Sequence, residues 1–143
     1  NALFLLVAVF AIGPMADTFA FAVGITLKGK KLCPHVSPKK TVSGAIGGII
    51  GGIAAGIIIH LVFSSLFEYI SLPHIAVMAA VGALGAFFTE AGDLAESALK
   101  RKLGIKDFGN LLPGHGGVLD RVDGIMFNAI FIYAFFSYII IMI

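Results

Sequence analysis

The sequence predicts an all-α membrane protein with about four transmembrane helices. Of its 143 residues, 59% are hydrophobic and only 13% are charged, whereas soluble domains carry about 25% charged residues. The mean hydropathy is +1.02, and apolar stretches of about 20 residues recur, which is the length that crosses a bilayer. The single cysteine, Cys33, excludes an internal disulfide.

Four apolar stretches are the expected spans, at about residues 1–24, 42–67, 72–94 and 122–143. The third is expected to continue as a helix to Lys102. In the first, Gly13-Pro14 should kink or locally open the helix, because proline lacks an N–H. In the second, a glycine at every fourth position should let neighbouring helices approach closely. These glycines are Gly44, Gly48, Gly52 and Gly56.

The basic residues predict the orientation of the spans. Five lie between the first and second spans, five lie between the third and fourth, and the turn at residues 68–74 has none. Because loops rich in Lys and Arg stay in the cytoplasm, both basic loops are predicted to be cytoplasmic and both chain ends external. The ten residues are Lys28, Lys30, Lys31, Lys39, Lys40, Lys100, Arg101, Lys102, Lys106 and Arg121.

Carboxylates are predicted to gather at this same membrane face. Seven of the eight acids fall there, and Glu68 is the exception. Acids and bases at one face indicate a site for phosphates and a metal, with Mg²⁺ as the expected cation and a second cation left open. The seven acids are Asp17, Glu90, Asp93, Glu96, Asp107, Asp120 and Asp123.

The end of the third span carries the densest acidic group. Glu90, Asp93 and Ser97 are spaced i, i+3, i+7 and therefore share one helix face, with Glu96 about 60° round from Asp93. Acids at a helix C-terminus oppose the helix dipole, so a compensating cation is expected. The alternative is a solvated helix end with ordinary surface acids.

The fourth span opens with Asp120 and Asp123, which fit both an N-cap with its first turn and a pair of cation ligands. The glycine-rich stretch 113–117 precedes them, and its backbone could approach an anion closely. His115 within it is either a phosphate donor or a surface residue.

Two further features have competing interpretations. Lys28, Lys30 and Lys31 are consistent with anchoring to anionic lipid head groups, whereas Lys39 and Lys40 stand at the entry of the second span, where helix N–H groups attract phosphate. An ionisable residue inside a span, here Asp17, is functional by default. Its alternative is a structural pair with a loop lysine.

Taken together, these motifs resemble the phosphatidate cytidylyltransferases, also called CDP-diacylglycerol synthases. The upstream likeness includes Ser37-Pro-Lys-Lys-Thr41, and one departure is Val42-Ser43, where many relatives have Trp-Glu. Family members carry further membrane helices before this region, so the N-terminal part is expected to be absent, and residues 1–143 are expected to form one membrane-embedded catalytic region. The signature residues are Ser97, Lys100-Arg101, Lys106-Asp107, Pro113-Gly-His115-Gly-Gly117 and Asp120-Arg121-Val-Asp123.

The resemblance implies that CTP and phosphatidic acid react to give CDP-diacylglycerol and pyrophosphate. Glu96 and Asp123 are the expected metal ligands, followed by Asp93 and Asp120, and Ser97 would contact metal or phosphate. The expected catalytic residues are thus Asp93, Glu96, Ser97, Asp120 and Asp123. The expected substrate-binding residues are Asp17, Lys39, Lys40, Lys100, Arg101, Lys106, His115 and Arg121.

A cation- or proton-coupled transporter is the alternative function. A transporter needs polar groups near the membrane midplane, whereas these carboxylates are predicted to cluster at one interface. We expect a multi-pass protein of a bacterial inner or cell membrane with its active site on the cytoplasmic side. We also expect membrane lipid as a partner, a homodimer, and no nucleic-acid partner.

Overall fold

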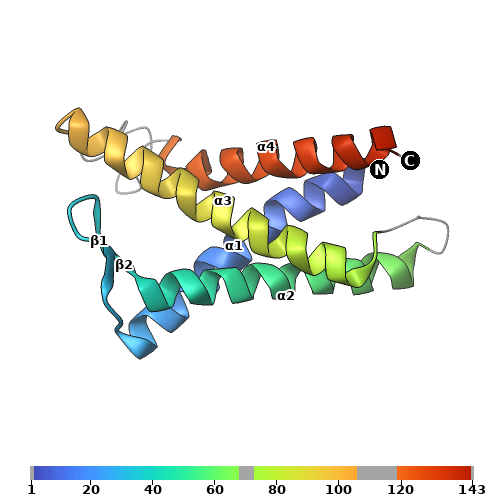
Figure 1. The fold of residues 1–143 in the computed structure, drawn as a ribbon, viewed down its shortest axis with the longest axis horizontal. Coiled ribbons are helices and arrows are strands. Elements are labelled where there is room, and N and C mark those ends of the chain that lie inside the picture. The colour runs from blue at the N-terminus through green and yellow to red at the C-terminus, as the bar shows by residue number, and fades with distance from the viewer. Residues whose placement is uncertain (1, 68–72, 106–118, 143) are drawn as a thin grey trace.

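Four helices make up most of the part of the chain that the structure describes, which confirms the all-α prediction (Figure 1). The computed structural model describes residues 2–67, 73–105 and 119–142, with side chains in the last segment limited to residues 124–138. Three helices are long and apolar enough to cross a membrane, and the described part of the fourth adds a shorter apolar helix, Gly124–Tyr138. The helices are α1 (Ala2–Leu27), α2 (Val42–Leu66), α3 (Ile75–Lys102) and α4 (Leu119–Met142).

The helix bounds differ from the predicted spans by a few residues. The first helix ends three residues later than expected, and α3 begins three residues later but does continue to Lys102. The structure continues α1 through Pro14 without a break, so the Gly13-Pro14 pair does not divide the span. Thr18 Oγ1 donates a hydrogen bond to the Pro14 carbonyl oxygen at 2.7 Å.

A short β-hairpin between α1 and α2 was not predicted. Strand β1 (Lys31–Cys33) pairs antiparallel with β2 (Ser37–Thr41), with Lys31 opposite Thr41 and an irregularity in register. The prolines at 34 and 38 favour extended backbone in the residues before them. The strands are too short for the alternation of polar and apolar residues that identifies a strand in a sequence.

Glycines let α2 lie against two neighbours at once. A Cβ on Gly44 would lie 2.9 Å from the Ala20 carbonyl oxygen of α1, and a Cβ on Gly56 would overlap the Met78 carbonyl oxygen of α3. Lipid removes the hydrophobic driving force between helices, so such close backbone packing carries much of the association. The predicted packing role of the four-residue glycine repeat is therefore confirmed.

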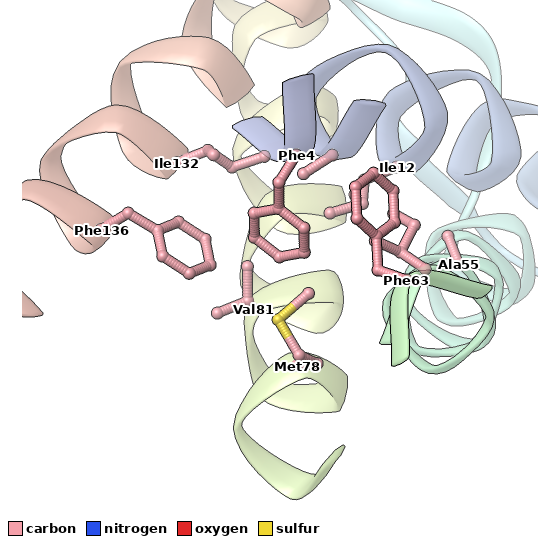
Figure 2. Close-up of a cluster of buried hydrophobic side chains, with 10 residues drawn as sticks. Phe4, Ile12, Ala55, Phe63, Met78, Val81, Ile132 and Phe136 are labelled. Atoms are coloured by element: carbon pink, nitrogen blue, oxygen red, sulfur yellow. The ribbon is translucent and has the colours of Figure 1, made fainter. Parts of the chain in front are cut away.

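An aromatic and aliphatic core joins all four helices (Figure 2). Phe4 of α1 meets Phe63 of α2 edge-to-face with ring centroids 5.2 Å apart, and meets Phe136 of α4 at 5.3 Å. Met78 and Val81 of α3 are fully buried in the same cluster. This core fixes the helices around the half of the bundle that holds the N-terminus.

The hairpin and the C-terminal end of α3 lie at the opposite end from both chain termini (Figure 1). An ion pair between Lys40 of β2 and Asp93 of α3 directly joins these two segments. The two basic regions of the sequence thus converge on one end of the bundle, as their distribution predicts.

Candidate phosphate-binding site

A pocket of about 650 Å³ opens where α1, the hairpin and α2 meet. One face of α1 supplies Asp17, Phe21 and Gly24, which are spaced by four and three residues, and Lys28 directly follows the end of this helix. Among the described residues, those that line it are Asp17, Ala20, Phe21, Gly24, Ile25, Lys28, Gly29, Lys31, Lys39, Lys40, Thr41, Gly44, Ala45 and Glu90.

A chain of hydrogen bonds holds the pocket's mouth in place. Gly29 N donates to Ser43 Oγ at 3.3 Å, and Ser43 Oγ donates to Thr41 Oγ1 at 3.2 Å. Thr41 is the N-cap of α2, and its hydroxyl oxygen accepts from Gly44 N at 3.1 Å. The cap therefore does two things: it satisfies a helix N–H and ties the end of α1 to the start of α2.

Four lysines line this pocket. Lys39 and Lys40 were predicted to bind substrate, and the structure brings both to the lining together with the predicted Asp17. Lys28 and Lys31 join them, although the sequence analysis interpreted both as membrane anchors. The hairpin explains the position of Lys31, because pairing Lys31 with Thr41 lays β1 beside the strand that carries Lys39 and Lys40.

Glu90 of α3 also lines the pocket and is only 9% exposed. Its carboxylate lies against the backbone of α2, because a Cβ on Gly48 would be 2.5 Å from Glu90 Oε1. Within the described part of the chain, Oε1 is buried without a hydrogen-bond partner. The sequence places Glu90 on the face of Asp93 and Ser97, but only the packing of α3 on α2 turns it into the pocket.

Lysines compensate the acids at the end of α3. Lys40 Nζ lies 2.5 Å from Asp93 Oδ2, and Lys100 Nζ lies 3.4 Å from Glu96 Oε1. Glu96 is only 8% exposed, which is inconsistent with the alternative of a freely solvated helix end. Acids at a helix C-terminus need a positive charge nearby, and here two lysines supply it.

Arg101 connects α3 to the hairpin. Its Nε donates to the backbone carbonyl oxygen of Val36 at 3.4 Å, across 65 residues of sequence. This is a long and therefore weak hydrogen bond. The terminal guanidinium nitrogens keep their capacity to hold a phosphate.

Several predicted site residues cannot be placed with the rest. Lys106 and His115 lie outside the described residues, and α4 begins at Leu119 with its first side chains also outside them. This applies to Asp120, Arg121 and Asp123. Ser97 is half-buried on α3, one residue beyond Glu96.

The donor chemistry of this end suits a hard divalent cation, since Asp93, Glu96 and Ser97 offer only oxygen atoms. Among the described side chains, however, no group of three or more His, Cys, Asp or Glu residues is close enough to hold a metal. A cation here would compete with Lys40 for Asp93 and would need further ligands. The sequence predicts Asp120 and Asp123 for this role, and their side chains lie outside the described residues.

Fold and site together define a class: a polytopic membrane protein that gathers lysines and carboxylates around a pocket at one end. Residues 1–139 match the model of the Cytidylyltransferase family. The match covers nearly the whole chain, so the chain belongs to the cytidylyltransferase family.

Curated relatives agree with this assignment. A phosphatidate cytidylyltransferase of Bacillus subtilis (strain 168) is 44% identical over 120 residues, which are 82% of this chain and 41% of the relative. Another, of Brucella abortus biovar 1 (strain 9-941), is 42% identical over 130 residues, 91% of this chain and 46% of the relative. One of Rickettsia prowazekii (strain Madrid E) is 38% identical over 113 residues, 79% of this chain and 50% of the relative. The chain spans about half the length of these relatives.

Proposed function

We propose that the protein transfers a cytidylyl group from CTP to phosphatidic acid, giving CDP-diacylglycerol and pyrophosphate. The observation that carries this proposal is the meeting of the lysine-lined pocket with the paired acids of α3, in a chain of the cytidylyltransferase family. A phosphate oxygen of the lipid attacks the α-phosphorus of CTP. The bond from that phosphorus to the oxygen bridging to the β-phosphorus breaks, and pyrophosphate leaves with the electron pair.

Such a transfer needs positioning and charge neutralisation more than a strong base. Lys39 and Lys40 on β2 would neutralise phosphate from one side, and Lys100 and Arg101 at the end of α3 from the other. Ser97 would contact phosphate or metal. The remaining proposed substrate-binding residues are Asp17, Lys106, His115 and Arg121.

We further propose Mg²⁺ as cofactor, with Asp93, Glu96, Asp120 and Asp123 as ligands. When bound, the ion would draw charge away from the phosphate oxygens. Asp93 and Glu96 would hold it in place of the lysines that they now face. We also keep a second cation as part of the hypothesis. In addition, we propose a homodimer, which cross-linking in native membranes would test.

The direct test is incorporation of labelled CTP into lipid by purified protein in vesicles that contain phosphatidic acid. We expect a lipid-soluble labelled product and released pyrophosphate, with both lost when Mg²⁺ is chelated. Ion flux across the vesicles without any labelled lipid would favour the transporter hypothesis instead. The relatives described above are all cytidylyltransferases and give the transporter no support.

The proposed orientation has its own test. With Cys33 replaced by serine, a cysteine placed at Lys30 should be protected from a membrane-impermeant thiol reagent added outside the cell. A cysteine placed in the turn at residues 68–74 should react, because that turn lacks basic residues. If a cysteine at position 30 were labelled from outside, the proposed orientation would be wrong and the active site would lie on the external side.

A further inference from the structure

We propose that the pocket between α1, the hairpin and α2 receives the phosphate head group of a diacyl lipid, with Lys28 and Lys31 among its ligands. The acyl chains would lie along the exposed face of α1 that carries Phe21 and Ile25. This assignment rests on the proposed function and deepens it, because it separates the lipid subsite from the site of the nucleotide triphosphate.

Charge is the first support. Of the residues that the structure describes, four lysines and two carboxylates, Asp17 and Glu90, belong to the lining. Among the described residues Lys40 and Lys100 form ion pairs, whereas Lys28, Lys31 and Lys39 do not. A phosphate monoester carries between one and two negative charges near neutral pH and three acceptor oxygens, so it matches the cations that remain.

The depth of the charges along α1 is the second support. Asp17 lies ten residues before Leu27, the last residue of α1, which is about 15 Å of helix, and Lys28 directly follows. The lysines therefore stand at the mouth and Asp17 lies deeper. Between them Phe21 and Ile25 are 71% and 55% exposed and belong to the pocket lining. A basic mouth over an apolar wall fits a molecule with a charged head and hydrocarbon tails.

The same wall is unsuited to a nucleotide. Below the lysines the lining consists largely of Ala20, Phe21, Gly24, Ile25 and Ala45, whose side chains offer no hydrogen-bond donors or acceptors. Ribose and cytosine placed there would lose their hydrogen bonds to water without replacement, which is costly. Acyl chains have no such bonds to lose.

The backbone at the pocket's mouth is the third support. Lys28 has φ of 43°, a left-handed conformation that a residue with a side chain seldom adopts. Its N–H donates to Gly24 O at 3.3 Å, and the next residue, Gly29, is held by Ser43. Strained residues persist where the surroundings fix them, and they gather at binding sites. Here the left-handed residue is itself part of the pocket lining.

The test measures lipid binding without CTP. The full protein in nanodiscs of phosphatidylcholine would be titrated with phosphatidic acid, a monoester, and separately with phosphatidylglycerol, a diester. The test variant is Lys28→Gln/Lys31→Gln. Lys30→Gln is the matched control, since Lys30 belongs to the same segment but not to the pocket lining. Thermal unfolding of each variant checks that the fold is retained, and Lys28→Arg/Lys31→Arg should restore binding if charge is what matters.

We expect the double variant to bind phosphatidic acid at least about tenfold more weakly, since a hydrogen bond to a charged group contributes roughly 1.5–3 kcal/mol. The control should change by less than twofold, and CTP affinity should stay the same in all variants. Equal losses for Lys30→Gln, or for both lipids, would mean simple surface attraction and would overturn the assignment. A loss of CTP affinity in the double variant would also overturn it, by making the pocket the nucleotide site.

These outcomes are separable from the failure of the proposed function. If binding depends on Lys28 and Lys31 but no labelled CDP-lipid forms, the lipid subsite stands and the proposed reaction falls. If turnover occurs and the double variant keeps the wild-type KM for phosphatidic acid, the reaction stands and the subsite falls.

Discussion

The crossing of α2 with α3 is held by close backbone packing, whereas the basic end of the bundle is held by charged side chains. At the crossing, backbone meets backbone, because a Cβ on Gly52 or Gly56 would collide with carbonyl oxygens of α3. At the basic end, the same helices are joined through long charged side chains, such as Lys40 to Asp93. At the crossing there is no space for a larger side chain. At the basic end the contacts between segments depend on charge, and a pocket stays open.

We therefore expect the first half of α3 to determine the stability of the protein and the second half to determine its activity. Its first half packs through Met78, Val81 and Gly82, which are buried. Its second half carries Asp93 and Glu96, each facing a lysine. Substitutions in the first half should lower stability, and substitutions in the second half should lower turnover with the fold intact.

The largest effect should come from Asp93→Asn. It keeps the shape of the side chain but removes the charge that faces Lys40 and that would hold the metal. We expect turnover to fall by about 10²-fold or more, the scale for losing one strong electrostatic contact, with little change in thermal unfolding. Asp123→Asn should behave alike. Glu68→Gln, outside the predicted cytoplasmic face, is the matched control and should remain active. Near wild-type activity of Asp93→Asn at limiting Mg²⁺ would remove Asp93 from the ligand set.

The next effect should come from Gly56→Ala, which tests the crossing. The new methyl group would overlap the Met78 carbonyl oxygen, so α2 and α3 must move apart. Overpacking of this kind costs about 1–3 kcal/mol, measurable as a lower midpoint of thermal or denaturant unfolding in detergent. Gly13→Ala is the control, because its Cβ would lie 3.6 Å from the nearest atom, Thr89 Oγ1, an ordinary contact. Equal stability of the two variants would contradict the tight crossing.

The smallest effect should come from Arg101→Lys. This variant tests whether Arg101 binds a substrate phosphate or only anchors the protein to lipid head groups. Lysine keeps the charge but replaces a planar fork with a point charge and loses the Nε bond to Val36. We expect the apparent KM for CTP or phosphatidic acid to rise by about tenfold or less, on the scale of one hydrogen bond, while membrane insertion stays normal. Lys102→Arg, on the same helix turn, is the control. Unchanged kinetics would leave Arg101 with an anchoring role and move the phosphate contact to Lys39, Lys40 or Arg121.

Composition and the distribution of charges are enough to predict the class of fold and the end of the bundle at which the site lies. Spans are readable from composition because a bilayer demands about 20 apolar residues in a row and internally satisfied backbone. The basic residues predicted that both charged segments meet at one end, and the ion pair of Lys40 with Asp93 agrees with that. Motif spacing was enough to identify the family, which the match over residues 1–139 confirms.

Which side chains share the pocket depends on how the helices and the hairpin pack together. Lys28 and Lys31 differ little from Lys30 in sequence, and only the fold separates them, through the backbone turn at Lys28 and the hairpin pairing of Lys31. Glu90 enters the pocket because Gly48 allows α3 to approach α2 closely. Helix periodicity fixes which residues share a face of one helix, but which face meets which neighbour depends on packing between helices. That packing is set by contacts between residues far apart in the chain, and local sequence does not encode it.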